Sequence, residues 1–162
     1  MKKSIITFAL IALTNLMAAT TISQQTTNQE NAIKTAIDGY MTSINTLDEN
    51  LTRSIWLDAP DISFITPRGN LAGIDNIWKE HYQGAMARSS TRKLEYTDLV
   101  IKVYENTAIT YFNWIFNSVT DGNSRESRGR ETIVLVQRNG QWKIAHIHYG
   151  SMPATNEQPN TQ

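Results

Sequence analysis

Near the C-terminus, two segments rich in β-branched and aromatic residues flank the dipeptide Asn139-Gly140. A two-residue Asn-Gly connection is the strongest short-range signal for a type I′ β-hairpin. Such a turn places Arg138 opposite Gln141 and thereby sets the register of every pair behind it. The chain is therefore constrained to fold around a long antiparallel hairpin with two defined faces.

This register sorts the hairpin side chains into two faces. On one face, Glu131 is expected directly across from His148, with His146 nearby. The other face is expected to carry Arg130, Thr132, Ile147 and Tyr149. Both faces are largely apolar, with polar groups gathered at one end. We therefore expect a core or pocket to cover one face, and a partner protein or another segment of this chain to cover the other.

The N-terminus has the three-part pattern of a secretory signal peptide. Lys2 and Lys3 precede an apolar stretch over residues 5–19, and a polar segment follows over residues 20–31. The apolar stretch is too short to span a bilayer, so we expect no membrane span in the mature chain. Residues 1–23 are thus expected to be removed on export to a periplasm or the extracellular space. A buried N-terminal helix is the alternative interpretation.

The rest of the chain has the length of one domain, expected over residues 24–153, with a polar, disordered tail over 154–162. Basic and acidic residues balance at 15 each, which disfavours nucleic acid or an anionic membrane as a partner. The sequence has no cysteine, which excludes disulfides, thiol catalysis and thiolate metal sites.

Hydrophobic periodicity predicts three helices and five strands. The helices are expected over residues 29–47, 48–57 and 73–84, with Asp48 as the N-cap of the second. The strands are expected over residues 61–66, 93–104, 108–119, 127–138 and 141–149, and a turn is expected over residues 67–70. Helices followed by a long antiparallel meander predict an α+β fold.

Three C-terminal motifs resemble the SnoaL-like branch of the nuclear transport factor 2 superfamily. They are Arg-Glu-Thr at residues 130–132, Asn-Gly-Gln-Trp-Lys-Ile at 139–144 and His-Ile-His-Tyr-Gly-Ser at 146–151. The same stretch is similar to the association domain of calcium/calmodulin-dependent protein kinase II, which belongs to that superfamily. In the N-terminal half, Tyr40 and the segments at 57–59 and 71–73 are similar to family members.

The resemblance implies a cone-shaped roll, in which three N-terminal helices pack in a strongly curved, mostly antiparallel mixed sheet. It also implies one open end and a homodimer paired through the sheets. Members of the superfamily include isomerases, dehydratases, cyclases, hydrolases, assembly modules and non-enzymatic binders. The fold alone therefore leaves the function open.

Tyr40 is the first candidate catalytic residue, because the resemblance aligns it with the oxyanion-hole tyrosine of ketosteroid isomerase. In this resemblance, the general base of ketosteroid isomerase is expected near residues 64–66, which contain no acidic residue. The second, protonated acid of its oxyanion hole is expected near Val134, which is apolar. A steroid-type isomerisation is therefore disfavoured. The alternative role for Tyr40 is a pocket wall or a core tyrosine.

Glu131 and His148 are the second catalytic candidates, because an imidazole held by a carboxylate can transfer protons near neutral pH. The alternative is a structural hydrogen-bonded pair at a dimer interface. We expect no cofactor and no metal. A site built on His146 and His148 would need a third ligand, and His81 is the only other histidine.

Ten residues are expected to line a ligand pocket in the cone: Trp56, Phe64, Trp78, Tyr82, Tyr111, Asn113, Arg130, Thr132, Ile147 and Tyr149. They predict a mostly apolar site with a few polar groups for a small apolar, carbonyl or carboxylate ligand, with Arg130 stabilising an oxyanion. The leading hypothesis is a small-molecule binder, with or without isomerase, cyclase or dehydratase chemistry. The alternative is a non-catalytic association module whose cone is filled by Trp and Tyr side chains.

Overall fold

The computed structural model describes the backbone of residues 4–153 and the side chains of residues 24–153. Its helices are α1 (Ser4–Thr46), α2 (Glu49–Ile55), α3 (Ile74–Asn76), the π-helix η1 (Ile77–Gln83) and the 3-10 helix η2 (Met86–Arg88). Its strands are β1 (Ser63–Thr66), β2 (Gly69–Ala72), β3 (Thr91–Tyr104), β4 (Thr107–Thr120), β5 (Asn123–Arg138) and β6 (Gln141–Ser151). The predicted tail at 154–162 lies outside the described residues, as do the side chains of the predicted signal peptide at 1–23.

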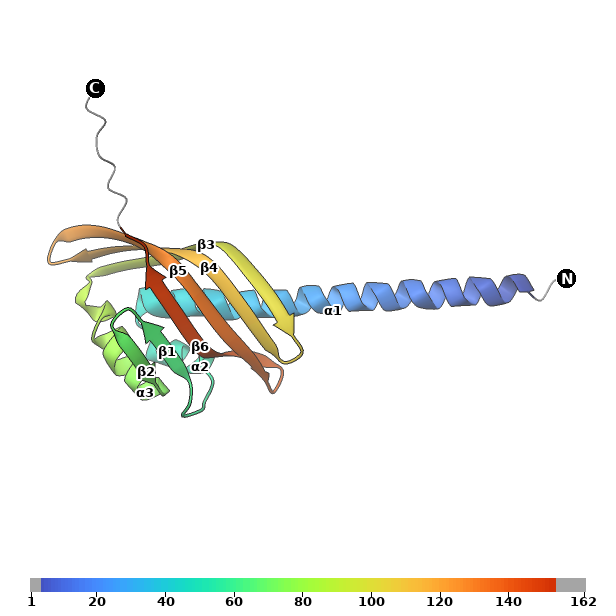
Figure 1. The fold of residues 1–162 in the computed structure, drawn as a ribbon, viewed down its shortest axis with the longest axis horizontal. Helices are drawn as coiled ribbons and strands as arrows, with labels where there is room; N and C mark the ends of the chain where they lie inside the picture. The colour runs from blue at the N-terminus through green and yellow to red at the C-terminus, as the bar shows by residue number, and fades with distance from the viewer. Residues whose placement is uncertain (1–3, 154–162) are drawn as a thin grey trace, which may run out of the picture.

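The six strands form one mixed sheet in the order β2-β1-β6-β5-β4-β3. Neighbouring strands run antiparallel, except that β1 and β6 pair in parallel. The sheet curves around the C-terminal half of α1, and α3 lies beside β2 (Figure 1). The predicted α+β cone of helices packed in a curved, mostly antiparallel mixed sheet is thereby confirmed.

Helix α1 is the axis around which the sheet wraps. Its inward side chains recur every three or four residues and are almost fully buried: Ile33, Ile37, Tyr40 and Ile44. The helix is longer than the predicted range of 29–47, and it ends where Leu47 adopts a left-handed φ of 53°. Among the residues with described side chains, no helix has the length and apolarity needed to cross a membrane.

The third predicted helix is a single α-turn that continues as a π-helix. The Gly84 N–H donates to the Lys79 carbonyl oxygen at 2.8 Å, which is the five-residue spacing of a π-turn. The wider turn brings four side chains of η1 to one buried face: Ile77, Trp78, His81 and Tyr82. Isolated π-segments often occur at functional sites, so this face is a first indication of where the site lies.

The β1–β2 connection is tighter than the sequence predicts. The turn predicted over residues 67–70 is wrong at its end, because β2 begins at Gly69. The Thr66 hydroxyl accepts the Arg68 N–H at 3.0 Å and closes the turn locally. Leu71 then pairs with Phe64 across the two strands. The hairpin therefore holds Arg68 at its tip.

The β5–β6 hairpin departs from the predicted register. Arg138 faces Gln141 as expected, and Asn139 and Gly140 have the positive φ angles of a type I′ turn. A bulge at Ala145 then shifts every later pair by one residue. The predicted pairing of Glu131 with His148 is therefore wrong, and Glu131 faces Tyr149 instead.

The bulge has a physical reason in the two isoleucines of β6. Ile144 and Ile147 are both fully buried, although a regular strand would point residues three apart to opposite faces. The extra residue lets both reach the core and turns His148 to the exposed outer face. Burying two isoleucines is more favourable than burying His146 and His148 in their place.

Candidate active site

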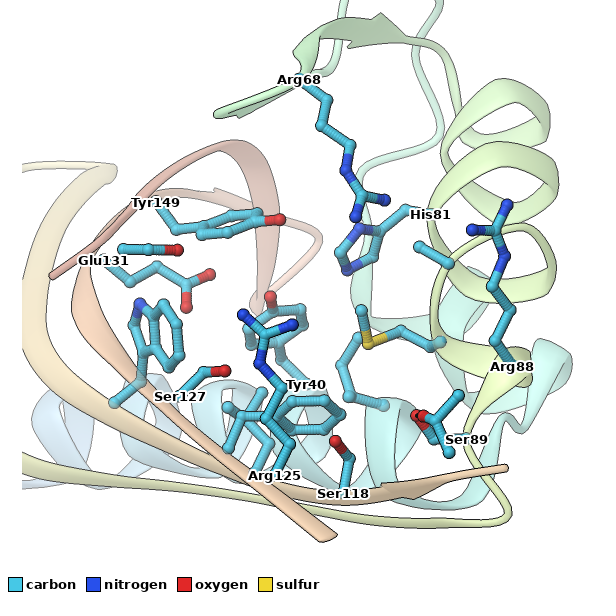
Figure 2. Close-up of a pocket in the computed structure, with 18 of the residues that line it drawn as sticks. Tyr40, Arg68, His81, Arg88, Ser89, Ser118, Arg125, Ser127, Glu131 and Tyr149 are labelled. Carbon is cyan, nitrogen blue, oxygen red and sulfur yellow. The ribbon is translucent and has the colours of Figure 1, made fainter. Parts of the chain in front are cut away.

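A cavity of about 480 Å³ opens at one end of the cone, between the inner face of the sheet and the π-helix. Its lining combines apolar side chains with polar ones from α1, η1, β4, β5 and β6, the main ones being Tyr40, His81, Trp114, Arg125, Glu131 and Tyr149. Figure 2 shows Glu131 and Tyr149 on one side of this space and His81 on the other. The volume suits a small organic molecule.

Glu131 is the only acid among the described residues that line this cavity. Its side chain is 3% exposed, and its Oε1 atom has no hydrogen-bond partner among the described residues. Burial raises the pKa of this carboxyl from 4.5 to about 8, although the neighbouring Tyr40 hydroxyl opposes the rise. At neutral pH, Glu131 is therefore mainly a neutral acid that can donate a proton.

Two tyrosine hydroxyls accompany this acid. Tyr40 projects from α1 and is 2% exposed, and burial together with the nearby Glu131 carboxyl raises its pKa well above the ordinary value. Tyr149 is the register partner of Glu131 on β6, and burial raises its pKa as well. Both phenols therefore keep their protons, and the wall offers neutral O–H donors without a fixed negative charge.

His81 faces this wall from the π-helix. Its side chain is 6% exposed, and its ring lies edge-on to Phe64 with 4.4 Å between ring centroids. Burial, together with the positive charge of Arg68, lowers the pKa of His81 from 6.5 to about 3. The imidazole is therefore neutral at physiological pH and has a ring nitrogen that can accept a proton.

Trp114 can lie flat against the sheet because its register partner on β5 is Gly129. A Cβ at Gly129 would overlap the indole ring of Trp114 and the carbonyl oxygen of Gly150. The indole in turn meets Tyr149 edge-on, with centroids 6.0 Å apart. Glycine at this position therefore shapes one wall of the cavity.

The residues predicted from the sequence fall into three groups. Three of them, Tyr40, Glu131 and Tyr149, line the cavity. Five others are largely buried in the core behind or beside it: Trp56, Phe64, Trp78, Tyr82 and Ile147. In this second group, Phe64 and Tyr82 contact His81 and so support the site from behind.

The third group points away from the cavity. Tyr111, Asn113, Arg130, Thr132 and His148 alternate with buried residues along β4, β5 and β6 and therefore lie on the outer face of the sheet. Tyr111 is 42% exposed, and the Asn113 amide donates to Asp98. Their expected place in the cone is wrong, because the sheet alternation and the bulge at Ala145 turn them outward.

Sequence reasoning missed several lining residues. His81 was considered only as a metal ligand, yet its spacing of four residues from Ile77 and three from Trp78 places it on the inward face of the helix. Arg125 lies near the start of the long strand β5, and no local sequence signal indicates that its side chain lines the cavity. No cluster of three or more metal-ligating side chains is present among the described residues.

The fold is that of the nuclear transport factor 2-like superfamily. Residues 33–155 match the SnoaL-like domain family, and the chain belongs to that family. No curated protein matches the chain significantly.

Solved structures agree with this assignment. A nuclear transport factor 2-like superfamily protein from Salmonella enterica is 31% identical, with a TM-score of 0.75 over 83% of this chain and 98% of that one. A protein provisionally named as a dehydratase from Streptomyces avermitilis is 20% identical, with a TM-score of 0.69 over 76% of this chain and 97% of that one. A protein provisionally named as a ketosteroid isomerase from Shewanella frigidimarina is also 20% identical, with a TM-score of 0.65 over 74% of this chain and 94% of that one. The last two likenesses concern the fold alone.

Proposed function

We propose that this protein binds a small carbonyl compound in the cone and catalyses cofactor-independent proton transfer on it, as an isomerase or a dehydratase. The observation that carries the proposal is Glu131, a buried neutral acid with an unpartnered oxygen at a cavity wall. Leaving a buried carboxyl oxygen without a partner is costly. A bound ligand would supply the missing hydrogen bond.

The chemistry follows from the protonation states of the lining groups. Glu131 and Tyr40 would donate hydrogen bonds to the carbonyl oxygen of the ligand, as a protonated acid and a phenol can in an apolar site. His81 would accept a proton from the carbon next to that carbonyl, and the C–H electron pair would move toward the oxygen as an enolate stabilised by both donors. In a β-hydroxy compound, the enolate electrons would then expel the hydroxyl group, which takes the proton held by His81 and leaves as water.

Proteins that share this fold support the reaction class, since two of the similar structures are provisionally named as a dehydratase and a ketosteroid isomerase. The open cavity also favours binding over the alternative association module, whose cone would be filled by its own aromatic side chains. A catalytic role for His148 with Glu131 is not retained, because the two side chains lie on opposite faces of the sheet.

Two further parts of the proposal concern the chain as a whole. Export, followed by removal of residues 1–23, is supported by the charged, apolar and polar order of the N-terminus. A homodimer paired through the sheets is supported by the exposed apolar side chains Tyr104, Ile109 and Tyr111 on the outer face. The mass of the secreted chain and light scattering of the purified protein test the two points separately.

The proton-transfer step can be measured without knowledge of the natural substrate. In D₂O, NMR follows the exchange of the α-protons of a small aryl ketone such as β-benzoylpropionate or its methyl ester. We expect the protein to accelerate the exchange and Glu131→Gln to reduce the acceleration by about tenfold or more, the scale of a lost hydrogen-bond donor. Glu126→Gln, an exposed change on the same strand, is the matched control. The absence of both acceleration and binding would contradict the proposal.

A further inference from the structure

Three arginines line the cavity from three separate elements. Arg68 comes from the β1–β2 turn, Arg88 from η2 and Arg125 from β5. None of them forms an ion pair among the described residues, whereas Arg53 and Arg128 elsewhere on the surface do. Unpaired guanidinium groups gathered at one opening form an electropositive entrance.

No negative charge among the described lining residues offsets these arginines. Glu131 is the only acid among them and is held mainly neutral by burial, and His81 is neutral too. Glu80 lines an adjoining pocket of about 310 Å³, but its carboxylate lies 3.7 Å from the Lys79 ammonium group. At neutral pH, the described cavity lining therefore carries a net positive charge.

The arginine side chains reach toward the reactive wall. In Figure 2, Arg68 descends from the β1–β2 turn toward His81, and Arg125 rises from β5 in front of Tyr40 in this view. The charge of Arg68 also helps to lower the pKa of His81 and opposes the burial-driven rise in the pKa of Tyr149. The field of this arginine thus extends to both sides of the cavity.

We infer that the ligand is an organic acid, with a carboxylate held by Arg68 and Arg125 and an uncharged carbonyl oxygen held by Glu131 and Tyr40. The planar guanidinium fork matches a carboxylate in a bidentate pair, which a neutral ligand cannot form. Apolar side chains in the same lining, Ile44, Leu94 and Phe116, suit a hydrocarbon or aromatic body. The inference rests on the proposed function and adds the class of substrate.

A bound carboxylate would also change the base. Its negative charge would offset the positive charge of Arg68, one of the two causes that hold the pKa of His81 low. The imidazole would then be a stronger base in the complex than in the free protein. An anionic ketone would therefore exchange its α-protons faster than a neutral ketone at equal occupancy of the site.

The test compares β-benzoylpropionate with its uncharged methyl ester. Isothermal titration calorimetry is carried out on the wild type, Arg68→Met, Arg125→Met and the control Arg128→Met. Arg128 lies on the same strand as Arg125 and is likewise exposed, but it pairs with Glu126 and does not line the cavity. Melting curves verify that each variant is folded.

We expect the acid to bind the wild type at least about tenfold more tightly than the ester, the scale of one charge-assisted pair. Arg68→Met and Arg125→Met should each weaken the binding of the acid about tenfold and leave the binding of the ester unchanged. Arg128→Met should change the affinity for neither compound.

The outcomes separate the inference from the proposed function. Equal binding of acid and ester, with α-proton exchange intact, would overturn the organic-acid assignment alone. A loss of affinity in Arg128→Met equal to that in Arg125→Met would overturn it too, because the effect would then be one of general charge. Displacement of the acid by equimolar inorganic phosphate would show a site for any small anion. Binding of neither compound, without exchange, would overturn the proposed function itself.

Discussion

Replacement of Glu131 by glutamine is expected to remove a pH dependence from the stability of the protein. The pKa of Glu131 is 4.5 in an ordinary environment and about 8 in the fold. For a group whose pKa rises on folding, the stability is fully present below the unfolded pKa and is lost as pH rises through the folded pKa. In that interval only the folded protein holds the proton, so the free energy of unfolding falls with increasing pH.

The magnitude follows from the width of the interval. Each pH unit across which only the folded state keeps the proton costs about 1.4 kcal/mol of stability. The interval from 4.5 to about 8 therefore amounts to about 5 kcal/mol, with about 2 kcal/mol of it between pH 6.5 and 8. Because Glu131 is 3% exposed, solvent screening reduces this figure little.

Urea denaturation of the wild type and Glu131→Gln at a series of pH values between 5 and 9 measures the effect. Other titrating groups contribute equally to both proteins, so the difference between the two curves isolates Glu131. We expect the variant to gain about 3 to 5 kcal/mol relative to the wild type over this range, while Glu126→Gln follows the wild type. Parallel curves for wild type and Glu131→Gln would refute the reasoning, because Glu131 would then titrate in the folded protein as it does in water.

Three further predictions concern other parts of the cone. Because the pKa of His81 is lowered to about 3 in the fold, the stability it contributes is present above pH 6.5 and is lost as the pH falls toward about 3. The variant His81→Gln should lack this acid sensitivity. Its free energy of unfolding, measured with urea at pH 4 and pH 7, should therefore differ less between the two pH values than that of the wild type. Gly129→Ala should cost about 1 to 3 kcal/mol and shift tryptophan fluorescence, because the new Cβ displaces the Trp114 ring, whereas Gly150→Ala has open space and should do neither. Asp48→Ala should cost about 1 kcal/mol in chemical denaturation, because its side chain accepts the Leu51 N–H at 2.9 Å and caps α2, and an unchanged midpoint would argue against the cap.

Much of the local structure could be predicted because it depends on neighbouring residues. The Asn139-Gly140 turn needs two positive φ angles, and the Asp48 cap needs a side-chain acceptor three residues before Leu51. The inward stripe of α1 follows from helical spacing alone, so the burial of Tyr40 is visible in the sequence. The family resemblance then supplied the curved sheet around this helix.

The sequence by itself thus determined the helices, the long strands, the hairpin turn and the α+β fold, because each depends on spacing and turn chemistry within a few residues. The tertiary structure decided which side chains meet. The parallel pairing of β1 with β6 and the burial of Ile144 and Ile147 are long-range effects that accompany the bulge at Ala145. Because of that bulge, Tyr149 and not His148 pairs with Glu131 across the two strands. The curvature of the sheet places Arg125, from the far end of β5, in the lining of the same cavity. Burial then gives Glu131 and His81 their unusual proton affinities, which depend on the whole packed environment and not on the adjacent sequence.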